Sequence, residues 1–224
     1  MSLIYPGPRK RSASEASPYG PFDSVPEAPS GDQQKRTKTY DSELDAIDVI
    51  PVADAWPVDL SCILGSPTGE SGRIPGHDNW GNYREGKSAF VFVVQGGCMV
   101  HYDLLCAILP ELYNISPALQ ALVLCRDPSS HTPSVSVPFS LPLIQAVGPS
   151  WNHFVRLGLL HPLGGGQVPL DALVVVDAKG KRRLVLPFGW GAGRHVGDVG
   201  GGKMVQERLM GMLRKCIEEL QREM

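Results

Sequence analysis

Hydrophobic and polar positions form regular patterns from about Ser88 onward. The run SAFVFVVQ, which begins at Ser88, is apolar, rich in valine and phenylalanine and bounded by glycine, and it predicts a buried strand. In MVHYDLLCAILPEL, leucine and isoleucine recur at helical spacing and predict a helix, with Pro110 near its end. The segment SPALQALVLC starts with Ser116 and Pro117, which suit the cap and first turn of a helix. We expect a short helix there, with a strand as the alternative.

Two weaker elements follow. The segment SVSVPFSLPLI is interrupted by Pro138 and Pro142, so it can form at best an edge strand. The segment SWNHFVRLGLL has Ser150 as its cap and stops before Pro162, which predicts another helix.

The clearest local pattern is a hairpin followed by a helix. Apolar runs near 172–177 and 182–188 are joined by DAKGK, with Gly180 where a short hairpin loop needs a left-handed residue. The segment 203–224 has one apolar stripe and charged residues on its other faces, which predicts an amphipathic helix. The stripe consists of Val205, Leu209, Met212, Leu213, Cys216 and Leu220.

These elements together indicate the fold class and the domain organisation. Strands and helices without a regular β–α–β alternation predict an α+β fold over 86–224, a small mixed domain with a β-hairpin and a C-terminal amphipathic helix. Residues 1–40 are rich in proline, serine and charge, and they predict a disordered regulatory tail. Residues 41–85 are expected to hold an acidic-hydrophobic motif and a linker.

Composition limits the classes of partner. The formal net charge of −2 removes the strong attraction to nucleic acid that a basic protein would have, so we expect no nucleic-acid partner. The chain has no apolar run of about 18 residues, so we expect no membrane helix and no membrane partner. Five scattered cysteines and a start unlike a secretory signal predict reduced thiols and an intracellular, nuclear or nucleocytoplasmic location.

The glycine-rich stretch GDVGGGKMVQERL comes within one residue of a nucleotide-binding P-loop. Gly197, Gly202 and Lys203 fit that motif, but Met204 stands where a hydroxyl residue should bind magnesium. The loop also does not leave a buried strand directly. We therefore expect a connector between the hairpin and the last helix and no cofactor, with at most a weak anion site at the helix start.

One cysteine is a candidate nucleophile. Cys98 follows two glycines and precedes the predicted helix, whose N-terminus could stabilise a thiolate. In that interpretation His101, His153 or His161 would be the base and Gln95 an oxyanion donor. The favoured alternative is a buried structural cysteine. No histidine and cysteine spacing matches a zinc module, so we expect no metal site.

The tail carries two short basic clusters that resemble nuclear-import signals. They consist of Arg9, Lys10, Arg11, Lys35, Arg36 and Lys38. Three serines beside them fit phosphorylation patterns, and a phosphate there would cancel local positive charge. They are Ser12, Ser14 and Ser17.

The stretch DAIDVIPVAD resembles a SUMO-interacting motif, in which an aliphatic segment adds a strand to a partner's sheet while its acids meet basic residues. Its aliphatic residues are Ile47, Val49, Ile50 and Val52. The favoured alternative is an edge strand of the chain's own domain.

A second resemblance involves the hairpin. DAKGKRRLVLPF, followed by a helix, is similar to the first hairpin and helix of certain fungal ubiquitin-like domains. The residues that match in type are Asp177, Ala178, Gly180, Pro187 and Phe188. The glycine-rich insert before the helix departs from that pattern.

These observations lead us to expect a non-enzymatic interaction or regulatory protein that acts in the nucleus. Its expected partners are proteins, among them an import receptor and SUMO-like proteins. The apolar stripe of 203–222 either packs on the domain, which is the favoured alternative, or supplies a face for self-association. The alternative is a cysteine-dependent hydrolase or transferase that uses Cys98 and a histidine base.

Overall fold

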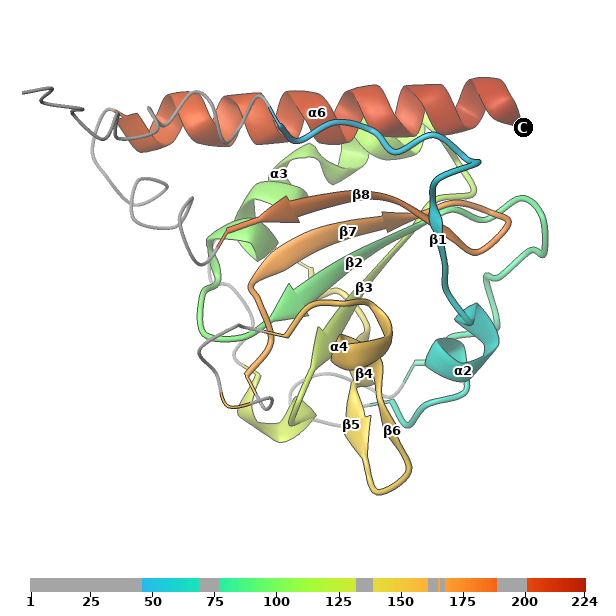
Figure 1. Ribbon diagram of the computed structural model, residues 1–224, viewed down its shortest axis with the longest axis vertical. Coiled ribbons are helices and arrows are strands. Elements are labelled where there is room, and N and C mark those ends of the chain that lie inside the picture. The colour runs from blue at the N-terminus through green and yellow to red at the C-terminus, as the bar shows by residue number, and fades with distance from the viewer. Residues whose placement is uncertain (1–45, 69–76, 132–138, 161–164, 166–167, 189–200) are drawn as a thin grey trace, which may run out of the picture. The chain divides into compact units, whose positions relative to one another are not determined.

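The computed structural model describes residues 46–68, 77–131, 139–160, 165, 168–188 and 201–224, all within one compact unit of residues 39–224. A six-stranded mixed sheet lies at its centre, with α3 and α6 over one face and α2 and α4 on the other side (Figure 1). The predicted α+β class is confirmed.

The sheet has the strand order β1-β8-β7-β2-β3-β4. Its strands are β1 (Trp56–Pro57), β2 (Phe90–Gln95), β3 (Gln120–Cys125), β4 (Leu143–Gln145), β7 (Ala172–Val176) and β8 (Lys181–Pro187). A small separate hairpin pairs β5 (Val147–Gly148) with β6 (Trp151–Asn152). The helices are α2 (Leu60–Leu64), α3 (Val100–Ile115), α4 (His153–Arg156) and α6 (Gly201–Glu223), with a 3-10 turn η1 (Pro128–Ser130).

The sheet is parallel on one side of β2 and antiparallel on the other. Strands β2, β3 and β4 run parallel to one another, whereas β7 pairs antiparallel with both β2 and β8. Along β2, Val91 and Val93 face α3 and α6, while Phe90, Phe92 and Val94 face α2 and α4. This period of two buries both faces of the strand, which explains its continuous apolar sequence.

Two sequence predictions for local structure need correction. The segment expected to form a short helix after Ser116 is the strand β3, as in our alternative, because six residues pair with β2 and all six are buried. Ser116 instead ends α3. The helix predicted from Ser150 is reduced to the four residues of α4, with the Asn152 side chain accepting from the amide of Val155 as its cap.

The hairpin and the last helix are confirmed. Strands β7 and β8 form the hairpin, and Gly180 has a φ of 72° in its loop. Helix α6 packs on α3 and β8 through its apolar stripe, which the sequence also offered as a face for self-association. In the structure this stripe is part of the core, since Leu209, Leu213 and Cys216 are fully buried.

The fold includes residues that the sequence assigned to a linker before 86. Strand β1 pairs with β8, and α2 places Ile63 and Leu64 against the phenylalanines of β2. Asp59 caps α2 by accepting from the amide of Cys62. No helix among the described residues is long and apolar enough to cross a membrane.

Candidate functional site

The candidate site lies where the central strand ends and the first long helix begins. Gly96 and Gly97 follow β2, and Cys98 then leads into α3. Cys98 is only partly buried. Because β2 and β3 are parallel, their carboxyl ends meet at this edge of the sheet, which is where open α/β sheets bind ligands.

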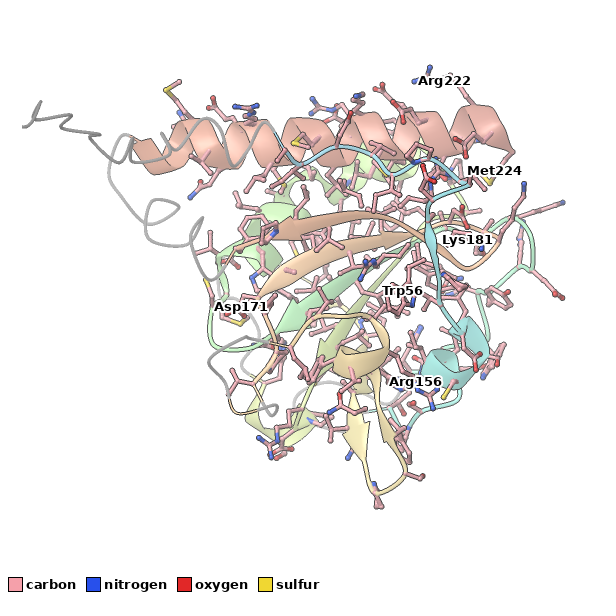
Figure 2. The ribbon with its side chains drawn as sticks, viewed as in Figure 1. Trp56, Arg156, Asp171, Lys181, Arg222 and Met224 are labelled. Carbon is pink, nitrogen blue, oxygen red and sulfur yellow. The ribbon has the colours of Figure 1, made fainter. Side chains whose placement is uncertain are left out.

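A carboxylate from another part of the chain is held in this loop. Asp171 stands directly before β7, and its Oδ1 accepts from the amides of Gly96 at 2.7 Å, Gly97 at 3.1 Å and Cys98 at 3.1 Å. Figure 2 shows Asp171 at the end of the sheet where this loop lies. Converging amides of this kind form an anion-binding concavity. The loop therefore has an anion site, and the chain's own carboxylate occupies it.

Glycine is required at the first position of this loop. A Cβ on Gly96 would come within 2.7 Å of the carbonyl oxygen of Pro169, so any side chain would push the two segments apart. At Gly97 a Cβ would have no atom within 4 Å, so a side chain could be accommodated there.

His101 is the second residue of α3 and is completely buried. Its Nε2 donates to the carbonyl of Val94 at 2.9 Å, and its ring stacks on Phe188 with centroids 5.5 Å apart. Burial lowers its pKa, although the charge of Asp171 acts in the opposite direction. His101 is therefore a neutral imidazole. Its Nδ1 has no hydrogen-bond partner among the described residues.

Gln95 and His131 form a second pair at the same edge. The Gln95 Oε1 accepts from His131 Nδ1 at 2.7 Å, and its Nε2 donates to the sulfur of Met99 at 2.7 Å. Burial lowers the pKa of His131, whose ring stands edge-on to Tyr102. Both ends of the Gln95 amide are thus already engaged, so the side chain is not free as an oxyanion donor in this arrangement.

His153, one of the three histidines considered as a base in the sequence analysis, lies elsewhere. His153 belongs to the core on the α2 and α4 side of the sheet, and its Nε2 lies 2.6 Å from the hydroxyl oxygen of Ser66. Burial lowers its pKa to about 4. The structure therefore does not bring His153 and Cys98 together, and His161 lies outside the described residues.

The other cysteines divide into two kinds, and all five are free. Burial raises the pKa of Cys106 to about 11 and of Cys125 and Cys216 to about 12, as is typical of structural thiols. Cys62 is partly buried like Cys98, and the Arg156 guanidinium donates to its sulfur at 2.5 Å. Over the described parts of the chain, no three histidine, cysteine or acidic side chains are grouped as metal ligands would be.

The SUMO-interaction-like segment is engaged with the chain's own domain. Ile47 and Val49 pack on the core below α6, whereas Val52 is exposed. The amide of Ile50 donates to the carbonyl of Arg183 at 2.7 Å, and the Arg183 Nε donates back to the carbonyl of Ile50 at 2.6 Å. The segment thus lies along β8, but residues 46–52 form no strand of the sheet, unlike the edge strand of our alternative. The basic clusters and serines of the tail lie outside the described residues.

Sequence reasoning identified Cys98, Gln95 and His101 but missed Asp171 and His131. Asp171 reaches the loop because β7 pairs with β2, with Val94 opposite Ala172. That pairing is not encoded near either residue. The one available signal was an acidic residue directly before a buried strand.

Comparison with known proteins gives one partial sequence match. No family model matches the chain. The Uba3-binding protein but1 of Schizosaccharomyces pombe is 46% identical over 60 residues, which is 26% of this chain and 23% of that protein. The chain therefore matches about a quarter of the length of that relative.

Several solved structures have a similar arrangement. The bacterioferritin comigratory protein of Xanthomonas campestris, described by its alkyl peroxide reduction activity, is 14% identical with a TM-score of 0.43, covering 70% of this chain and 98% of that one. The mitochondrial 2-Cys peroxiredoxin of Plasmodium falciparum is 12% identical with a TM-score of 0.46, covering 71% and 93%. A Xylella fastidiosa PrxQ variant is 13% identical with a TM-score of 0.39, covering 71% and 96%.

These neighbours correct our sequence-based expectation of function. We predicted a non-enzymatic protein with regulatory, nuclear and phosphorylated character and leaned against an enzyme. The neighbours are peroxiredoxins, and one is described by an enzymatic activity, so that prediction is wrong as a description of proteins with this arrangement. With identities of 12–14% and TM-scores below 0.5, the likeness concerns the fold and assigns no activity to this chain.

Proposed function

We propose that the chain is a thiol-dependent oxidoreductase in which Cys98 supplies the electrons. The observation that carries the proposal is the position of Cys98, which is partly exposed and stands between the carboxyl end of β2 and the start of α3. Ligands bind at this edge in open parallel sheets, and the amides of the loop already bind one anion, the carboxylate of Asp171. The three buried cysteines, with raised pKa values, are unsuited to such a role.

The surroundings of Cys98 favour oxidation of the thiol over hydrolysis or group transfer. A cysteine hydrolase needs a base within hydrogen-bond reach of the sulfur. Three of the described histidines are hydrogen-bonded to other residues: His101 to Val94, His131 to Gln95 and His153 to Ser66. Oxidation by a hydroperoxide has no such requirement, since it depends on access and on the thiolate fraction.

The proposed step is balanced with one hydroperoxide as the oxidant. The Cys98 sulfur attacks the terminal peroxide oxygen, a sulfur–oxygen bond forms and the oxygen–oxygen bond breaks. The thiol and the hydroperoxide become a sulfenic acid and an alcohol, with the thiol proton passing to the departing alkoxide. Two equivalents of an external thiol then restore the Cys98 thiol, giving one disulfide and one water.

The test is consumption of cumene hydroperoxide by the purified chain with excess dithiothreitol. We expect Cys98→Ser to reduce consumption to the level of the buffer with dithiothreitol alone, while Cys62→Ser keeps the rate of the unchanged chain. Cys62 is the matched control because it is the other partly buried thiol. Equal rates in the two variants would rule out Cys98 as the electron donor.

We also propose a specific protein partner, a Uba3-type protein. The observation in its favour is the 46% identity over 60 residues with a protein named for binding Uba3. Isothermal titration of the chain with purified Schizosaccharomyces pombe Uba3 tests it. Saturable binding supports the proposal, and absence of heat at micromolar concentrations of both proteins contradicts it.

We also propose an intracellular location for the protein. All five cysteines are free, which suits a reducing compartment. A fluorescent fusion found outside the cell or in the secretory pathway would contradict it.

A further inference from the structure

A large open groove lies far from Cys98. It has a volume of about 1140 Å³ and is formed by the second half of α3, the start of β3, residues 139–142, the loop before β2 and the end of α6. In Figure 2, Met224 at the end of α6 and Asp171 beside the Cys98 loop lie on opposite sides of the folded region. The groove is therefore a separate feature from the thiol site.

The groove is lined by apolar side chains together with polar ones such as Asn82, Gln120 and Gln221. Leu109 and Leu119 line it from within the core, and three larger side chains extend into solvent. Tyr113 is 39% exposed, Phe139 is 40% exposed and Met224 is 54% exposed. Exposed aromatic side chains gathered at a hollow are typical of surfaces that bind another protein.

The charged side chains that line this groove, Arg84 and Lys87, are both positive, and none of its described lining residues is aspartate or glutamate. Glu111 lies beside lining residue Pro110, but its carboxylate is paired with Arg214 at 2.6 Å. Glu85 is exposed beside Arg84 without lining the groove. Two positive side chains beside exposed aromatic residues favour a partner segment that carries negative charge next to an apolar anchor.

We infer that this groove binds a segment of a partner protein that carries an aromatic or aliphatic anchor residue between acidic residues. The anchor would pack against Tyr113 and Phe139, and the acids would face Arg84 and Lys87. The inference rests on the partner binding proposed above and names the surface for it. It is independent of the chemistry at Cys98.

The experiment uses two labelled ten-residue peptides and the full chain. One peptide contains one tryptophan and one leucine among glutamates and glycines, and its counterpart has lysine in place of each glutamate. Fluorescence anisotropy is measured in low salt and in 0.3 M salt. We expect the acidic peptide alone to bind, and its affinity to fall in high salt because exposed charge pairs are screened.

Variants then locate the binding site. Arg84→Glu with Lys87→Glu is expected to weaken binding of the acidic peptide about fivefold or more. Phe139→Ser is expected to weaken it about tenfold, as for an anchor contact. The control for charge is Arg156→Glu with Lys203→Glu, which changes net charge equally at exposed residues outside the groove. The control for the anchor is Val155→Ser, an exposed apolar residue of α4.

Two results would overturn the inference: an acidic peptide that fails to bind, or one that binds the groove and control variants equally. Titration with Uba3 separates the two proposals. If the acidic peptide binds as expected and Uba3 does not bind, the groove is supported as a binding site and the proposal of a Uba3-type partner is contradicted. If Uba3 binds the groove variants as tightly as the unchanged chain, Uba3 is supported as a partner and the groove is not its binding site.

Discussion

Arg183 of β8 and Glu223 in the last turn of α6 form a two-pronged ion pair. The Arg183 Nη1 lies 2.5 Å from Glu223 Oε2, and its Nη2 lies 2.8 Å from Oε1. The same buried guanidinium contacts Asp177 at 3.4 Å, and its Nε donates to the carbonyl of Ile50. One side chain thus joins the hairpin, the end of the last helix and the segment at residues 46–50.

We expect Arg183→Met to lower the free energy of unfolding by about 3 kcal/mol, because its loss leaves the buried Asp177 carboxylate and the Ile50 carbonyl without compensation, whereas Glu223 is 43% exposed and stays hydrated. Chemical denaturation followed by circular dichroism measures this. The control is Lys203→Gln, which breaks an exposed pair with Glu207 and is expected to change stability by less than about 0.5 kcal/mol. Similar losses in the two variants would show that the Arg183 network does not hold these elements together.

The buried His153 predicts a dependence of stability on pH. Burial lowers its pKa in the folded state from the ordinary 6.5 to about 4, so between these values the unfolded chain binds more protons. Its contribution to stability is complete above about pH 6.5 and is lost as the pH falls toward 4. His101 and His131, whose pKa values are also lowered by burial, act in the same direction.

The measurement is the urea midpoint of unfolding at several pH values from 7.5 to 4.5, for the unchanged chain and for His153→Gln. We expect a smaller decrease toward low pH in the variant, whatever its stability at pH 7.5. Parallel curves would mean that His153 titrates alike in the folded and unfolded states.

Asp171 is expected to restrain the reactivity of Cys98. Its carboxylate uses the loop amides and places a negative charge beside the start of α3. Asp171→Asn removes that charge, so we expect Cys98 to react with iodoacetamide about two- to fivefold faster, the size of a charge effect at a helix terminus. The rate is measured by mass spectrometry in a Cys62→Ser background. Unchanged or slower alkylation would show that Asp171 serves only to hold the loop.

Two glycines give opposite predictions for the same substitution. Gly180→Ala places a side chain at a φ of 72° and a Cβ within 2.9 Å of the carbonyl oxygen of Val58, so we expect a loss of about 1–2 kcal/mol or more. Gly211→Ala lies inside α6 with nothing within 4 Å of its Cβ, so we expect a gain of up to about 1 kcal/mol. Thermal denaturation of both variants tests the pair, and a shift in the same direction would contradict it.

The elements that could be predicted from sequence are those with local signals. Strand β2 is a continuous apolar run, the β7–β8 loop contains Gly180, and α6 has an apolar stripe on an otherwise charged helix. Strand β3 was misassigned because Ser116 and Pro117 suit a helix start, whereas pairing with β2 and burial on both faces determine the structure. The parallel order of β2, β3 and β4 depends on contacts distant in sequence.

In the candidate site, too, residues with a local sequence signal could be predicted and residues placed by distant contacts could not. Cys98 was identifiable because strand, glycines, cysteine and helix follow one another along the chain. Asp171 was not, since the antiparallel pairing of β7 with β2 brings it beside Gly96 from 75 positions away. The hydrogen bonds of His101, His131 and His153 to Val94, Gln95 and Ser66 likewise depend on tertiary packing.

The most direct test of the account is the mass of the Cys62→Ser chain after brief exposure to one equivalent of cumene hydroperoxide with dimedone, a trap for sulfenic acids. The account predicts one dimedone adduct per chain, located on Cys98 by peptide mapping and lost in the Cys98→Ser variant. No adduct on Cys98, or adducts distributed over the buried cysteines, would contradict the claim that Cys98 is the electron donor of a thiol-dependent oxidoreductase.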